Sequence, residues 1–195
     1  MEITARMVGD LRERTGAGLM DCKRALQQAD GDMENAVLVL KKQGAIGAEK
    51  RVDRQVPEGA IFSYIHTGCR IGVLLLLRCE TDFVAKNSEF QTLGRDLCLH
   101  IAAANPSYVS AADIPADELQ REREVATGQL AGKPAHAVEA MIQGKLAKYA
   151  AGVCLLQQPF VKNPSMTVEE LLREYVARIG ENIRVGRFAR FQVGG

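Results

Sequence analysis

One stretch of the chain is apolar without alternation. Residues 71–77, Ile-Gly-Val-Leu-Leu-Leu-Leu, form this run, and it stops abruptly at the polar residues 78–82. A strand with one wet face shows an apolar side chain at every second position, so an unbroken run predicts a strand that is covered on both faces. Helices of the same chain can cover one face. We expect a further element on the other, and a second copy of the chain is one candidate.

The connection after this strand carries two large apolar side chains. Phe83 and Val84 interrupt an otherwise polar segment, and Lys86-Asn87-Ser88 then lead into a helical pattern. Binding residues are often found on connections that a rigid element supports. We therefore interpret residues 81–84 as a rigidly mounted probe for a partner protein. The alternative, to which periodicity gives equal weight, is that Phe83 folds back into the core.

The charge balance favours a protein partner over nucleic acid. The chain of 195 residues carries 25 Lys and Arg against 24 Asp and Glu, a net charge of +1, with both signs interspersed. Such a chain has no field strong enough to hold a phosphate backbone. The length predicts one domain with an appendage or two small domains.

The N-terminal residues and the cysteines indicate a reducing compartment. Residues 1–6 lack the apolar core of a signal peptide, and the longest apolar run is too short to span a bilayer. We expect no membrane segment and a location in the cytoplasm, or in the stroma or matrix of an organelle. The five cysteines are odd in number and widely spaced, which is typical of free buried thiols.

Three short helices are predicted at the N-terminus. Apolar residues at helical spacing predict a helix over residues 3–14, and a second one begins near Asp21 and ends near Ala29. Asp32 can cap a third helix, with Gly44 as its C-terminal glycine. We expect a three-helix unit over residues 1–45, of a size that usually binds something. Residues 46–57 then read as a solvated, partly helical linker.

The rest of the chain, residues 58–195, is predicted to form an α+β core and dimerisation domain. Residues 60–66 and 70–79 read as a β-hairpin around Thr67-Gly68, and residues 183–193 as a third strand. Five residues of that third strand alternate, and we place them on one face: Ile183, Val185, Ala189, Phe191 and Val193. The fold class is thus a three-stranded antiparallel sheet with helices on one face.

The helices of this domain are predicted from caps and breakers. Ser88 and Gln91 have the spacing of a capping box for a helix that runs to about Ala104, and Thr167 and Glu170 have it for a helix that ends at Gly180. Helical patterns over residues 115–123 and 136–149 lie between them. The assignment of residues 153–161 stays ambiguous.

No motif of covalent chemistry stands out. Residues 128–134, Gly-Gln-Leu-Ala-Gly-Lys-Pro, superficially resemble a phosphate loop, but the spacing is one residue short and Pro134 stands where a magnesium ligand belongs. His66, Cys69 and Cys79 lack the spacing of a metal site. His100 lies in an apolar helix and reads as a core histidine. We predict no catalytic residue, no cofactor and no metal.

Three segments resemble the elongation factor Ts family. Residues 11–26, LRERTGAGLMDCKRAL, and residues 79–87, CETDFVAKN, are similar to its two hallmark segments, and residues 179–191 resemble its closing helix and strand. The likeness covers essentially the whole chain. It is closest to the short form of the family, without the second core repeat and the coiled-coil insertion of longer members. Short members act as homodimers, which implies a homodimer through the sheet face.

The resemblance implies a role in protein biosynthesis as a guanine nucleotide exchange factor for elongation factor Tu. Such a factor binds the partner in its GDP-bound and nucleotide-free states, dislodges Mg²⁺ and promotes exchange of GDP for GTP. In the family, the segment that matches Thr81, Asp82, Phe83 and Val84 dislodges the magnesium ion. The family usually has Asn where this sequence has Arg78.

The resemblance also implies a role for the N-terminal helices. They would form a ubiquitin-associated-like domain that contacts the nucleotide-binding domain of elongation factor Tu through Arg12, Leu19 and Met20. The alternative, above all at Leu19, where the family often has Met, is an ordinary place on the surface or in the core of the bundle. An interaction or chaperone-like scaffold that binds a partner through this bundle without nucleotide exchange is the rival function, and a thiol enzyme using Cys79 is a weaker third.

Overall fold

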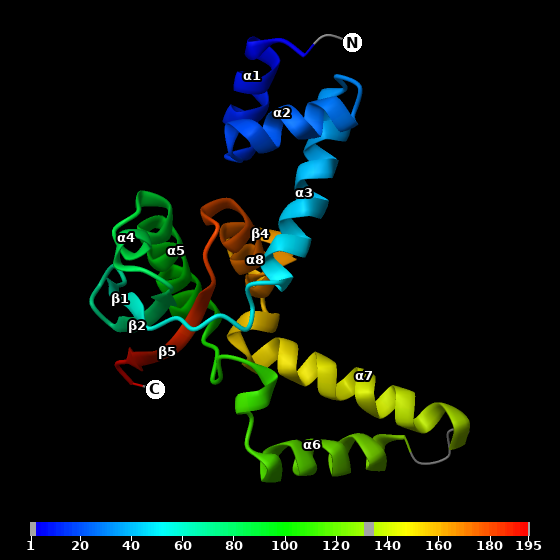
Figure 1. Ribbon diagram of the computed structural model, residues 1–195. Coiled ribbons are helices and arrows are strands. Elements are labelled where there is room, and N and C mark those ends of the chain that lie inside the picture. Colours follow the sequence, from blue (N-terminus) through cyan, green and yellow to red (C-terminus); the bar gives the residue numbers. More distant parts are fainter. Residues whose placement is uncertain (1–2, 131–134, 195) are drawn as a thin grey trace.

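The computed structural model describes residues 3–130 and 135–194. It contains an N-terminal unit of three helices, a central body with a three-stranded sheet, and a pair of helices that projects from the body (Figure 1). Among the described residues, none of the helices has the length and apolar character that crossing a bilayer requires.

The three predicted N-terminal helices are present. They are α1 (Ala5–Thr15), α2 (Leu19–Gln28) and α3 (Met33–Glu49). Asp32 caps α3 as predicted, because its side chain accepts a hydrogen bond from the backbone N–H of Asn35 at 2.9 Å. Leu11, Cys22 and Leu26 are fully buried where the three helices meet. The unit therefore has a small apolar core of its own.

The prediction that Gly44 ends the third helix is wrong. The helix α3 continues through Gly44 to Glu49 and lies against α8 (Val168–Ile179) of the body. A Cβ atom on Gly44 would lie 2.9 Å from the Cβ atom of Ala177. The glycine thus permits close approach of two helices. In the sequence alone, a glycine that serves this purpose cannot be distinguished from one that ends a helix. Residues 50–57 follow without a regular helix or strand.

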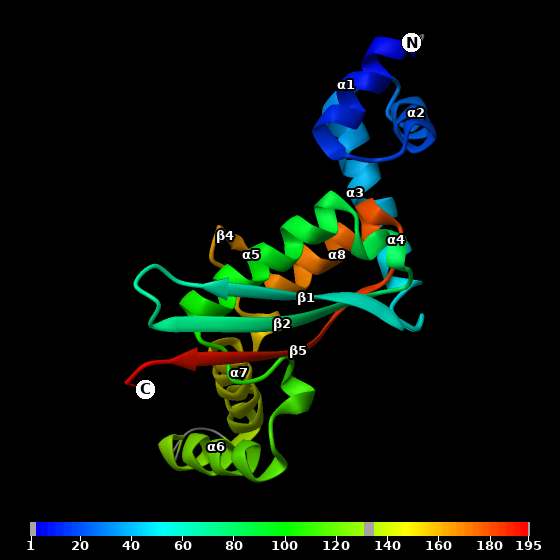
Figure 2. The same ribbon diagram turned by 90° about the vertical axis from the view of Figure 1, so that its left-hand side faces the viewer.

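The central sheet confirms the predicted α+β fold. It contains β1 (Glu58–Ile65), β2 (Ile71–Cys79) and β5 (Ile183–Gln192), in the order β1-β2-β5, with both pairs antiparallel. The helices α5 (Ser88–Ala104) and α8 cover one face, and Figure 2 shows the three strands in front of these helices. The side chains of Val73, Leu75 and Leu77 are buried beneath the two helices.

The other face of the sheet is apolar and open. The strand β2 is apolar on both faces, as its sequence predicted, but no described element covers its outer side. Ile61 is 74% exposed and Phe191 is 68% exposed. Further exposed apolar residues on this face and at its edge are Ile65, Leu74 and Val193.

The alternation predicted for the third strand is wrong beyond its first half. A β-bulge shifts the register between Leu76 and Leu77 of β2 and leaves Gly186 of β5 without a partner. One extra residue reverses which side chains point to which face. Val185 therefore faces the helices, whereas Phe191 lies on the open face. The five residues that we placed on one face are divided between the two.

One of the two predicted capping boxes is confirmed. Thr167 and Glu170 form it at the start of α8, which ends at Gly180 with a left-handed φ of 86°. At α5 the prediction is wrong, because Asn87 is the cap residue and accepts from the N–H of Glu89 at 2.7 Å. Gln91 instead donates to the carbonyl of Ala85.

The segment between α5 and α8 contains a helical hairpin and a second, small sheet. Two longer helices, α6 (Ala116–Gln129) and α7 (Ala135–Val153), pack side by side and project from the body (Figure 1). Short 3-10 turns at Ala111–Asp113 and Leu155–Gln157 flank them, and β3 (Pro159–Phe160) pairs with β4 (Asn163–Thr167). The helical patterns predicted over residues 115–123 and 136–149 correspond to these two helices.

His100 is a buried core histidine, as predicted. Its Nε2 atom lies 3.0 Å from the Oε1 atom of Gln158, and its Nδ1 atom accepts from the backbone N–H of Val161 at 3.2 Å. A ring with one accepting and one donating nitrogen is neutral. Burial lowers the pKa of His100, although the hydrogen bond to Gln158 opposes the shift.

We expect this histidine to make the protein less stable in mild acid. Its contribution is complete above the ordinary histidine pKa of about 6.5 and declines as pH falls below that value, because the unfolded chain takes up the proton first. The slope for one group is at most about 1.4 kcal/mol per pH unit. Urea unfolding at pH 7.5 and 5.5 measures it. The difference in the free energy of unfolding between the two pH values should shrink in His100→Gln and persist in His66→Gln, since His66 is exposed. Equal differences in both variants would refute the role of His100.

Candidate functional site

The connection after β2 is a single helical turn with one side in the core. This helix, α4 (Asp82–Ala85), is capped by Thr81, whose hydroxyl accepts from the N–H of Val84 at 3.4 Å. Val84 and Ala85 are buried against the body. Because these two side chains fix the inner side of α4, the residues before them project outward. The predicted four-residue site thus contains an anchor, Val84, as well as exposed groups.

Phe83 projects into solvent. It is 81% exposed, so the alternative that it folds back into the core is wrong for this structure. An aromatic ring in this position gains nothing for the isolated chain, because its apolar area stays in water. A large exposed apolar side chain on a supported turn is an informative feature of a surface and is typical of a contact site.

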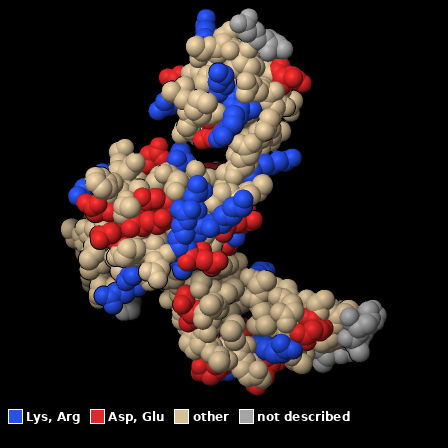
Figure 3. Space-filling model, viewed as in Figure 1, with Lys and Arg blue, Asp and Glu red and all other residues tan. Residues whose placement is uncertain are grey.

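An ionised carboxylate lies next to this ring. Asp82 forms an exposed ion pair with Lys86, with 2.7 Å between Oδ2 and Nζ. The hydrogen bond from Lys86 lowers the pKa of Asp82, so its carboxylate is charged at neutral pH. Figure 3 shows Lys and Arg beside Asp and Glu on the face that it presents, without one continuous basic surface. The exposed ring of Phe83 therefore lies next to an ion pair on the same turn.

A carboxylate from a distant part of the chain holds the start of α4. Glu181 lies one hundred residues further along, directly after the Gly180 cap of α8. It accepts two hydrogen bonds from Thr81, one from the backbone N–H at 3.0 Å and one from the hydroxyl at 2.7 Å. Sequence reasoning missed Glu181, since no periodicity links residues so far apart. Its place in the closing segment of the resemblance was the only signal.

The neighbouring turn is fixed by a buried asparagine. The backbone N–H of Asn182 donates to a carboxylate oxygen of Glu80 at 2.6 Å. Its side-chain amide donates to the carbonyls of Val52 and Arg54, at 3.2 and 2.8 Å. This residue is 3% exposed. The end of β2, the turn before β5 and the segment after α3 are thereby joined at one point.

The second group of predicted contact residues lies on the N-terminal unit. Arg12 is exposed in the last turn of α1, and Leu19 and Met20 are exposed at the start of α2. Met20 is 67% exposed, and Leu19 lies outside the buried cluster of the three helices. Leu19 therefore lies on the surface of the bundle and not in its core, and its contact with a partner stays a prediction. The structure leaves all three side chains accessible.

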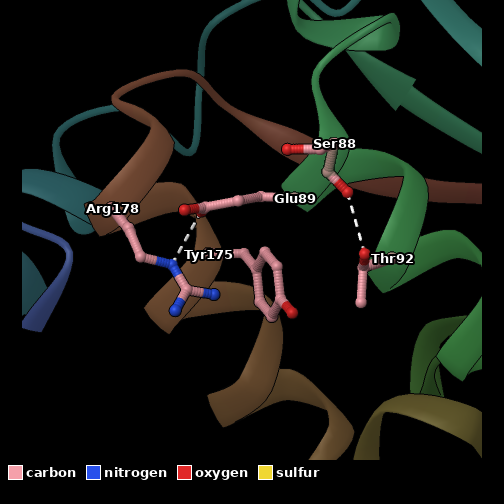
Figure 4. A pocket seen from close by; sticks show the side chains of 5 residues that line it. All are labelled: Ser88, Glu89, Thr92, Tyr175 and Arg178. Atoms are coloured by element: carbon pink, nitrogen blue, oxygen red, sulfur yellow. Dashed lines mark hydrogen bonds and ion pairs between the residues drawn. The ribbon is translucent and has the colours of Figure 1, made fainter. Parts of the chain in front are cut away.

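A polar hollow marks the junction between the N-terminal unit and the body. Its lining residues come from α5 and α8, and Figure 4 shows them: Ser88, Glu89, Thr92, Tyr175 and Arg178. The guanidinium of Arg178 lies 4.3 Å from the ring centre of Tyr175, and its Nε atom is 2.8 Å from a carboxylate oxygen of Glu89. A Cβ atom on Gly16 would lie 2.7 Å from the Cδ atom of Arg178. Since its charges are already paired, we interpret the hollow as a junction between helices.

The residues considered for thiol or metal chemistry are not brought together. Cys69 is exposed at the hairpin turn, whereas Cys79 is buried at the far end of β2. Burial and then the nearby carboxylate of Glu181 raise the pKa of the Cys79 thiol to about 11, which leaves it protonated at neutral pH. Within residues 3–130 and 135–194, no group of three or more His, Cys, Asp or Glu side chains is arranged to hold a metal ion.

The segment that superficially resembles a phosphate loop is only partly described. Gly128 and Gln129 form the end of α6, and Leu130 follows as its cap residue. Residues 131–134, which include Lys133 and Pro134, lie outside the described residues. The helical end shows no strand before a glycine-rich loop, which a phosphate loop requires.

Comparison with known proteins points to one family. Residues 38–195 match the family described as Elongation factor TS. The Elongation factor Ts of Carboxydothermus hydrogenoformans is 53% identical over 194 residues, which cover 98% of this chain and 89% of that protein. Those of Desulfotalea psychrophila and Fervidobacterium nodosum are 51% and 47% identical over 196 residues, each covering the whole of both chains.

Proposed function

Because the chain belongs to the elongation factor Ts family and is thus a translation elongation factor, we propose that it promotes GDP release from elongation factor Tu. The exposed Phe83 on the supported helix α4 carries this proposal, together with the likeness of residues 79–87 to a hallmark segment of the family. In the proposed reaction no covalent bond of the protein changes. The chain binds its partner in the GDP-bound and the nucleotide-free state.

The thermodynamic basis is linkage between two ligands. A protein that binds the nucleotide-free partner more tightly than the GDP-bound partner must weaken GDP binding by the same factor. Each tenfold of weakening corresponds to about 1.4 kcal/mol of differential interaction. A phenylalanine side chain that buries roughly 150–250 Å² at about 25 cal/mol per Å² contributes several kcal/mol before ordering costs. The free energy gained by burying Phe83 alone is therefore large enough to accelerate GDP release by orders of magnitude.

The magnesium ion of the partner explains why a small displacement suffices. Mg²⁺ requires near-ideal octahedral geometry, so it tolerates little movement of its ligands. Entry of Asp82 and Phe83 between helices of the nucleotide-binding domain would shift those ligands and loosen both the ion and the β-phosphate. Arg12, Leu19 and Met20 on the N-terminal unit supply a second contact with the same domain. We propose these residues, with Thr81 and Val84 as the base of α4, as the partner-binding site.

A second copy of the chain is the proposed cover for the open sheet face. Its exposed apolar residues share one face of one sheet: Ile61, Leu74 and Phe191, with Ile65 and Val193 at the ends of the strands. A patch of this kind marks an interaction site. A two-fold axis through the sheet would bury the same residues of both copies.

A nucleotide release assay tests the proposed function directly. Elongation factor Tu loaded with fluorescent GDP is mixed with excess unlabelled GDP, with and without the wild-type chain at one-tenth of the partner concentration. We expect release to accelerate more than tenfold and to turn over, because the differential binding needed is only about 1.4 kcal/mol per tenfold. Complex formation without acceleration would instead support the scaffold function through the helical bundle.

A further inference from the structure

We propose that Glu181 is a positioning residue that fixes the orientation of α4 and so the direction in which Phe83 projects. This inference rests on the proposed function, since positioning matters for exchange only if Phe83 enters the partner. Glu181 itself is removed from the exposed ring and holds Thr81 instead. It therefore acts through the base of the helix.

The geometry of Thr81 carries the inference. Its backbone N–H and its hydroxyl both donate to the carboxylate of Glu181, at 3.0 and 2.7 Å, while the same hydroxyl accepts from the N–H of Val84. A helix of one turn has few hydrogen bonds of its own, and isolated helices of that length are unstable. The start of α4 thus depends on an acceptor that lies outside it. Hydrogen bonds to an ionised carboxylate are about twice as strong as neutral ones.

The other end of this tether is itself immobile. Gly180 ends α8 in the left-handed conformation, and the buried Asn182 makes three hydrogen bonds to the body and to the segment after α3. Glu181 lies between these two fixed residues. A hydrogen bond to it therefore attaches α4 to a rigid support.

The fixed orientation of α4 should affect the rate of nucleotide exchange. If α4 were free to reorient, part of the interaction free energy of Phe83 would be spent on ordering the helix upon binding. A tethered helix avoids that loss, so the interaction free energy of Phe83 remains available to displace groups of the partner. Removal of the tether should then slow the displacement step, while the exposed contacts of the N-terminal unit keep their share of the affinity.

The test compares three variants in the release assay with saturating amounts of each. We expect Glu181→Ala to lower the maximal release rate about tenfold and to change the half-saturating concentration by less than about twofold, because two hydrogen bonds to a charged group are lost. Glu181→Gln keeps one accepting oxygen without the charge, and we expect a loss of about threefold. The matched control is Glu174→Ala, an exposed glutamate of α8, which should leave the rate unchanged.

Two outcomes would overturn the proposal. One is a folded Glu181→Ala variant with the maximal rate of the wild type, and the other is a loss that higher concentrations fully restore. Should Glu181→Ala fail to fold by circular dichroism, Glu181→Gln decides, and a wild-type rate in that variant rejects the tether.

A measurement without elongation factor Tu separates this proposal from the proposed function. Amide hydrogen exchange at Ala85 and Lys86, whose N–H groups donate within α4, should be about tenfold faster in Glu181→Ala than in Glu174→Ala. If the wild-type chain fails to accelerate GDP release, the proposed function fails. The amide hydrogen exchange rates then still show whether Glu181 holds α4. Equal protection in both variants would refute the tether.

Discussion

Replacement of Phe83 by alanine is expected to slow GDP release from elongation factor Tu about 30-fold at saturating protein. The reason is that the ring is the largest apolar group that α4 offers and is 81% exposed before binding. Truncation of a central aromatic contact in an interface typically costs about 2 kcal/mol or more, and each 1.4 kcal/mol is a factor of ten. Stopped-flow fluorescence of labelled GDP measures the rate.

The same substitution should leave the fold unchanged. Phe83 makes no contribution to the buried clusters of the described residues, whereas its neighbour Val84 does. We expect the free energy of unfolding to change by less than about 0.5 kcal/mol, as for other surface substitutions. Val125→Ala, at an exposed apolar side chain of α6, serves as the control and should release GDP at the wild-type rate. Release at full speed in Phe83→Ala would reject the role of the ring.

Local signals in the sequence were sufficient for most of the fold. The unbroken apolar run of β2, the capping box at Thr167 and the glycine at position 180 each depend on neighbouring residues, and each appears where the sequence placed it. The hairpin of β1 and β2 has the predicted strands and turn. Features with a short-range physical cause are therefore accessible from the sequence.

The features that the sequence did not reveal depend on contacts between distant segments. Gly44 has the form of a helix-ending residue, but its neighbour Ala177 lies on another helix. The bulge at Gly186 reverses the faces of β5, because the alternation beyond it depends on the register with β2. The same holds for Glu181, which meets Thr81 only after folding.

The candidate site was partly accessible from the sequence for the same reason. Periodicity placed Phe83 on a connection but left its direction open, because a single turn has too few residues to define a face. The structure resolves the direction through Val84, whose burial turns Phe83 outward. The resemblance supplied the residue roles, and these remain proposals.

Replacement of Leu74 by aspartate is expected to convert the proposed dimer into a monomer. Leu74 lies in the central strand on the open face, opposite Ser63 of β1 and Ala189 of β5, so it stands between two small side chains. In a two-fold interface each substitution is present twice. An unpaired buried carboxylate destabilises its surroundings by about 3–5 kcal/mol. Analytical ultracentrifugation should therefore give twice the mass of one chain for the wild type and the mass of a single chain for Leu74→Asp.

The control for this experiment makes the same chemical change elsewhere. Leu38 is an exposed leucine on α3, away from the sheet, and Leu38→Asp should keep the mass of the wild type. The buried side of β2 is carried by Val73, Leu75 and Leu77, so Leu74→Asp should retain the wild-type circular dichroism spectrum. A folded Leu74→Asp variant with dimer mass, or a wild-type chain that stays monomeric at all concentrations, would show that the open face does not join two copies. A monomeric variant that still accelerates GDP release would show that nucleotide exchange does not require the second copy of the chain.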